Sequence, residues 1–171
     1  MAFNLADQYF VKALEMYDYN LEEVVENLNY SLSYDPEHPA ANELMGRMYM
    51  DQFGELEKAK VYLDEAMAAD LSNLQVCESI TRWHIKMRAY KDALLVISYA
   101  SGLPGAQMDQ WIRMEALIYE LCKEYAKAMD LLKRALDESV SSEYSYFLKG
   151  ELNRVCSKHR NTLAFNYNYN G

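Results

Sequence analysis

The side chains able to do chemistry in this sequence are few and far apart. The cysteines and histidines are Cys77, Cys122, Cys156, His38, His84 and His159. Cys156 and His159 stand three residues apart and would share one face of a helix. Two ligands do not complete a zinc site, which needs three or four from the protein. The sequence therefore predicts no metal centre.

Catalytic motifs are missing as well. No nucleophile stands beside a base in a recognisable spacing, and no glycine-rich phosphate loop occurs. We therefore expect a non-enzymatic protein without a cofactor. The cysteines are odd in number and widely spaced, which indicates free thiols in a reducing, cytoplasmic compartment. The sequence begins without a secretory signal pattern and contains no run of about 20 apolar residues, so no membrane insertion is expected.

Acidic charge is concentrated in the first part of the chain. The net charge is −9, and residues 1–72 hold fifteen acidic and four basic side chains, a net charge of −11. An acidic surface repels phosphate groups, so nucleic acid is excluded as a partner. The acids either keep the outer helix faces soluble, or contact a basic partner, or join the two ends of neighbouring chains.

Helices must position these side chains, because the sequence is poor in residues that break them. It has three prolines and six glycines in 171 residues, and 51% of it is apolar. Residues 39–73 contain the apolar periodicity of two helices separated by a turn at residues 53–55. Small, aromatic and aliphatic residues mark this stretch in the order Gly46, Tyr49, Gly54, Leu56, Ala59, Leu63 and Ala66.

The pattern recurs along the chain with steps of 34 or 35 residues. Small side chains recur where two helices would have to cross closely. The four recurring columns are Gly46, Thr81, Ala116 and Gly150; Val24, Ala59, Ala93 and Ala128; Ser31, Ala66, Ala100 and Ala135; and Leu21, Leu56, Tyr90 and Tyr125.

This arrangement resembles the tetratricopeptide repeat, a helix–turn–helix unit of about 34 residues. The resemblance covers residues 4–158 and implies an all-α superhelix, or solenoid, of about four helix pairs plus a C-terminal capping helix. It implies one domain, residues 1–158. The predicted segments are a degenerate repeat 4–36, repeats 39–73, 74–108 and 109–142, a capping helix 143–158 and an Asn/Tyr-rich tail 159–171.

Several local features refine this prediction. Asn20 should cap the second helix, and Asp35 before Pro36 should end it. The period places Val11 at the first helix crossing, a bulky departure expected of a terminal repeat. Asp109 is a candidate cap for the first helix of the fourth repeat. Residues 101–105 form the strongest loop signal and are either a hinge or an ordinary turn between repeats.

The tail has a different pattern, because Phe165, Tyr167 and Tyr169 alternate with asparagines. This alternation is typical of a strand, and the composition is that of a low-complexity segment. The alternative is that the tail packs on its own groove or on a neighbouring chain.

The resemblance also implies a peptide-binding groove on the concave side, lined by the first helix of each pair. The corresponding residues are Glu43, Arg47, Met50, Asp51, Glu78, Arg82, Ile85, Lys86, Arg113, Leu117, Glu120, Leu121, Phe147, Glu151 and Arg154. Glu43 with Arg47, and Glu78 with Arg82, are either self-paired surface charges or arginines free to reach a peptide. The two glutamates stand where a subclass that clamps acidic chaperone tails has lysine or asparagine, which disfavours such a ligand.

The sequence therefore predicts a non-catalytic adaptor that binds a peptide segment of a partner protein in this groove. Bacterial secretion chaperones for translocated proteins are similar in size, acidity and repeat number, which makes such a chaperone the first alternative. A scaffold that self-assembles through its tail or its terminal repeats, driven by the uneven charge, is the second alternative.

Overall fold

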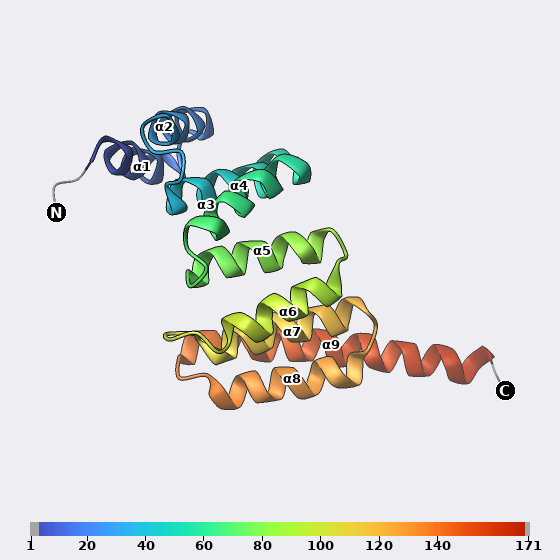
Figure 1. Ribbon diagram of the computed structural model, residues 1–171. Coiled ribbons are helices and arrows are strands. Elements are labelled where there is room, and N and C mark those ends of the chain that lie inside the picture. The colour runs from blue at the N-terminus through green and yellow to red at the C-terminus, as the bar shows by residue number, and fades with distance from the viewer. Residues whose placement is uncertain (1–3, 170–171) are drawn as a thin grey trace. The chain divides into compact units, whose positions relative to one another are not determined.

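The computed structural model describes the backbone of residues 4–169 and the side chains of residues 4–163, and this part of the chain is all helix and turn (Figure 1). It divides into two compact units between Val96 and Ile97. No described helix is long and apolar enough to span a membrane. The helices are α1 (Leu5–Met16), α2 (Leu21–Tyr34), α3 (Pro39–Met48), the π-helical turn η1 (Tyr49–Phe53), α4 (Leu56–Ala69), α5 (Leu74–Lys86), α6 (Tyr90–Ala100), α7 (Met108–Leu121), α8 (Tyr125–Glu138) and α9 (Ser142–Tyr169).

The helix ends follow the local capping chemistry. The side chain of Asn20 accepts from the N–H groups of Glu22 and Glu23 at 3.2 and 3.3 Å, so the predicted cap is confirmed. Helix α2 then ends at Tyr34, as Asp35 and Pro36 indicate. The prediction for Asp109 was wrong. Gln107 is the N-cap of α7, and Asp109 lies inside its first turn, where the helix dipole favours an acid.

The close crossing of α3 and α4 explains why residue 46 is a glycine. A methyl group on Gly46 would stand 2.7 Å from Leu63 Cγ and 3.3 Å from the Ala59 carbonyl oxygen. Real side-chain carbons do not approach so closely, so only glycine lets the two backbones meet here. The predicted packing reason for Gly46 is therefore confirmed.

At the two ends of the repeat series, the residues predicted to lie at a helix crossing are not packed against a neighbouring helix. Val11 is 37% exposed, and α1 instead buries Ala6 and Ala13. The hydroxyl of Ser31 donates to the Ala6 carbonyl at 2.9 Å, which fixes that register. At the other end, a methyl group on Gly150 would meet no atom within 4 Å. The crossing position of α9 is therefore open, and its glycine has no packing role.

The turn η1 absorbs one extra residue in the second repeat. Thirteen positions separate Gly46 from Ala59, whereas twelve separate the equivalent residues of the third and fourth repeats. Widening the last turn of the first helix into a π-helix keeps both flanking helices in register despite the insertion.

A residue in the left-handed region ends the first helix of three repeats. Gly54, Arg88 and Lys123 have φ values of 70°, 58° and 63°. The residue after each donates its N–H to a carbonyl in the last helical turn, at 2.9, 2.9 and 2.8 Å. These bonds close the helix in the Schellman manner in the third and fourth repeats, and in a widened form after η1.

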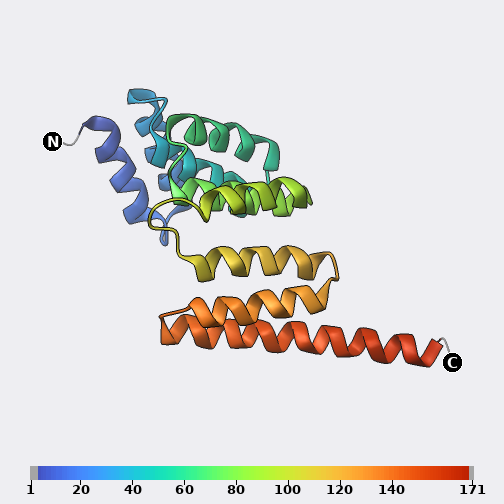
Figure 2. The same cartoon turned by 60° about the horizontal axis from the view of Figure 1, so that its bottom comes forward.

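Helix α9 is longer than the capping helix that the repeat pattern predicts. It has 28 residues and runs to Tyr169 (Figures 1 and 2). The strand-like interpretation of residues 165–169 was therefore wrong. The sequence offers no proline or glycine between residues 151 and 169 to end the helix. Residues 170–171 of the tail lie outside the described residues, and the packing of the tail stays a prediction.

Candidate peptide-binding face

The predicted groove residues of the N-terminal unit lie on α3, η1 and α5, which we call the first-helix face of that unit. Asp51 on η1 contacts two bases on α5: its carboxylate accepts from Arg82 Nη2 at 2.7 Å and lies 3.0 Å from Lys86 Nζ. Lys86 also donates to the carbonyl oxygen of Met50 at 3.3 Å. One acid therefore ties the first helices of two consecutive repeats together.

Glu43 is a buried member of the same face. It is 5% exposed, accepts a hydrogen bond from the Ser79 hydroxyl on α5, and lies 3.6 Å from Arg47 Nε. Burial raises the pKa of the Glu43 carboxyl, although the Ser79 hydrogen bond and the Arg47 charge act in the opposite direction. Arg47 in turn lies over the ring of Tyr17, 5.6 Å from its centroid. The pair is part of the packing between repeats.

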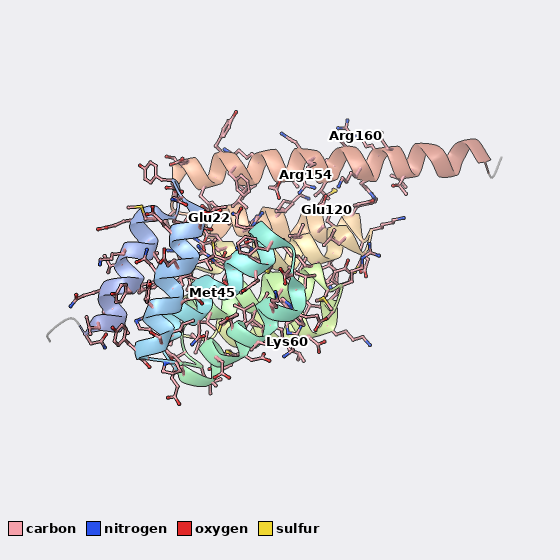
Figure 3. The ribbon with its side chains drawn as sticks, turned by 90° about the horizontal axis from the view of Figure 1, so that it is seen from above. Glu22, Met45, Lys60, Glu120, Arg154 and Arg160 are labelled. Carbon is pink, nitrogen blue, oxygen red and sulfur yellow. The ribbon has the colours of Figure 1, made fainter. Side chains whose placement is uncertain are left out.

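The C-terminal unit repeats this arrangement between α7 and α9, its own first-helix face. Glu120 is 5% exposed and pairs with Arg154, and it accepts from Lys158 Nζ at 2.8 Å. Arg154 also holds Glu151 through two bonds of 3.2 and 2.9 Å. Glu120 and Arg154 point toward one another in the space between α7 and α9 (Figure 3). Two bases thus neutralise one buried carboxylate.

Exposed apolar side chains adjoin these charges. Phe147 is 44% exposed, and the guanidinium of Arg113 lies over its ring, 5.1 Å from the centroid. Leu121, which follows Glu120 on α7, is 46% exposed. Arg113 Nη2 is 3.8 Å from Glu151, and its Nε is buried without a hydrogen-bond partner. The face therefore combines an apolar surface with oriented N–H donors.

Not every predicted residue reaches this surface. Met50 is 1% exposed and packs with Leu63 and Trp83 in the core, because η1 turns its side chain inward. Glu43 and Glu120 are buried as well. The remaining members are partly or fully exposed: Arg47, Asp51, Glu78, Arg82, Ile85, Lys86, Arg113, Leu117, Leu121, Phe147, Glu151 and Arg154.

Pairing between repeats replaces one of the pairs expected within a helix. Arg82 bonds to Asp51 rather than to Glu78, whereas Glu43 and Arg47 do pair within α3. Sequence reasoning missed Ser79 and Lys158, which complete the polar contacts. The sequence does contain a signal for these contacts. The two residues of each hydrogen bond are 31 to 38 positions apart, close to one repeat period.

No group of three or more potential metal ligands occurs within residues 4–163. Cys77 is buried, Cys122 is exposed and Cys156 is partly buried, and all three are free thiols. Cys156 lies on α9, so it shares a helix with His159 as the spacing predicted.

The fold matches solved structures although the sequence matches none of the known families. No protein-family model and no curated protein matches this chain. A structure from a functional characterization of Pseudomonas aeruginosa PilF covers 93% of this chain and 71% of its own, with a TM-score of 0.77 at 18% identity. MamA from Desulfovibrio magneticus RS-1, residues 41 to the end, covers 99% and 100%, with a TM-score of 0.68 at 14% identity. Another MamA structure covers 95% and 92%, with a TM-score of 0.62 at 16% identity.

These matches confirm the predicted fold class. The chain has the all-α fold of a tetratricopeptide-repeat protein, built from antiparallel helix pairs followed by a C-terminal helix. At identities of 14–18% the similarity concerns the fold alone.

Proposed function

We propose that this chain is a non-catalytic protein-interaction module that binds a peptide segment of another protein along its first-helix faces. The proposal is carried by two exposed apolar side chains of this face: Phe147, whose ring lies under the Arg113 guanidinium, and Leu121, which follows the Arg154-paired Glu120 on α7. Exposed apolar surface next to polar anchors is the usual composition of a binding site for a protein segment.

The charge pairing indicates which ligand chemistry fits. Arg82 and Lys86 already share the Asp51 carboxylate, so an acidic peptide would have to compete with it. A guanidinium carries five N–H donors, and those left over can bind a neutral carbonyl group without breaking an ion pair. The preferred ligand is therefore an extended segment with apolar side chains and free backbone carbonyls, or an apolar helix that offers the unpaired carbonyls of its last turn.

Affinity capture from the native host, followed by binding measurements with the captured segment, tests the proposal. Replacing Leu121 and Phe147 together by serine removes exposed apolar contacts and leaves the buried ion pairs intact. We expect the dissociation constant to rise at least about tenfold, the effect of losing about 1.4 kcal/mol.

Tyr146→Ser is the matched control, because Tyr146 is also an aromatic residue of α9 and is 81% exposed. This variant should bind like the wild type. Unchanged binding by the double serine variant would contradict the proposal. The cytoplasmic location stays a prediction.

A further inference from the structure

A second apolar groove lies on the N-terminal unit and is lined mostly by α2. It has a volume of about 700 Å³ and is formed by α2 together with Phe53 of η1. Leu21, Val25 and Tyr30 line it from α2, and Phe53, Tyr30 and Leu21 are 46%, 46% and 36% exposed. This volume is within the range of sites that bind ligands.

The rim of the groove is acidic. Glu22 and Glu26 line it, and neither forms an ion pair with a described basic side chain. The only contact recorded for the Glu26 carboxylate within residues 4–163 is a hydrogen bond from the Tyr30 hydroxyl at 3.3 Å. By sequence, residues 1–96 carry 17 acids and 8 bases, whereas residues 97–171 carry nine of each. An apolar groove with unpaired acids in the acidic part of the chain fits a basic, apolar segment.

The far end of α9 has this character. No acid follows Glu151 in the sequence, whereas three bases do. Two of these bases pair with Glu120, but Arg160 is exposed, has no recorded ion pair within residues 4–163, and lies on the outer side of α9 (Figure 3). Leu163 is 49% exposed. The helix continues to Tyr169 and projects beyond α7 and α8 (Figure 2).

We propose that the projecting end of α9 docks into the α2 groove of a second copy of the chain. Arg160 would face Glu22 and Glu26, and Leu163 would enter the apolar floor. Each copy offers one groove and one helix end, so the contact is head-to-tail and can link more than two copies. None of the residues that line this groove is among those assigned to peptide binding, so the inference goes beyond the proposed function.

Mass measured by sedimentation velocity over a range of concentrations tests the proposal. The chain has a mass of 19.9 kDa, and the wild type should form larger species that dissociate as salt screens the charges. The groove variant Glu22→Lys/Glu26→Lys and the end variant Arg160→Glu should each stay monomeric. A wild type that stays at 19.9 kDa at every concentration in low salt would overturn the inference.

Mixing the two variants gives the sharpest result. The groove variant keeps its helix end and the end variant keeps its groove, and the two sets of reversed charges also complement each other, so the mixture should assemble although neither variant does so alone. A mixture that remains monomeric would overturn the proposal. Arg134→Glu, which makes the same charge change at an exposed position of α8, should assemble like the wild type. Loss of assembly in this control would show that only net charge matters, and would also overturn it.

Discussion

Glycine stands at the crossing column of both α3 and α9, but the surroundings give the two residues opposite roles. Gly46→Ala would place a methyl group 2.7 Å from Leu63, whereas Gly150→Ala would place one in open space. Overpacking costs about 1–3 kcal/mol, and alanine gains about 1 kcal/mol over glycine inside a helix. We therefore expect chemical denaturation to show a loss of stability for Gly46→Ala and a gain for Gly150→Ala. Equal stability of the two variants would contradict the close crossing of α3 and α4.

The buried carboxyl of Glu43 predicts a dependence on pH. Its pKa is raised in the folded state, mainly by burial, so the folded chain holds this proton more strongly than the unfolded chain does. The stability that this provides is present at acidic pH and is lost as the pH rises through the folded-state pKa. Relative to the wild type, Glu43→Gln should therefore gain stability as the pH rises through the folded-state pKa of Glu43.

Unfolding by urea at several pH values measures this change for Glu43→Gln. Glu57→Gln is a suitable control, because it makes the same change in charge on the exposed side of α4. A Glu43→Gln variant that loses stability relative to the wild type as the pH rises would show that the ion pair with Arg47 outweighs burial.

At the scale of the helices, the ends of α5 and α7 place Arg88 and Lys123 in the left-handed region. A side chain costs roughly 1–2 kcal/mol there, and both residues are exposed. Glycine avoids this cost but loses more conformational entropy on folding. We expect Arg88→Gly and Lys123→Gly each to raise the free energy of unfolding by roughly 0.5–1 kcal/mol, as measured by chemical denaturation. Gly54→Ala, at the equivalent turn, should lower it, and a loss on either glycine substitution would refute the shared turn geometry.

The spacing of small residues predicted the helix pairs and the crossing at Gly46. The same packing between helices recurs in each repeat, so the small residues that allow it recur with the same period. It could not predict the burial of Glu43 and Glu120, since an acid enters the interior only when bases or hydroxyls of the neighbouring repeat meet it. The π-helical turn was visible as an extra position before Ala59, but sequence alone does not say where an insertion is absorbed. The length of α9 was missed because the alternating tail carries no residue that forces a helix to continue.

At the scale of the whole molecule, charge is distributed unevenly along the chain, and the ion pairs between repeats form within each unit. The acidic excess lies within residues 1–96, and acid–base pairs join consecutive first helices inside each unit. These pairs hold the first helices in register and leave apolar residues such as Ile85, Leu121 and Phe147 partly or fully exposed beside them. We assign partner binding to this side of the helix pairs and self-association to α2 and the projecting end of α9.

Site-specific photocrosslinking in the native host tests this assignment most directly. A photoreactive residue is placed at Leu121 on α7, which belongs to the first-helix face. In a second variant it is placed at Val61 on α4, the second helix of the second repeat, where the side chain is 61% exposed. We expect a partner protein to be captured from position 121 and not from position 61. Capture from position 61 alone, or equally from both positions, would contradict a binding face formed by the first helices.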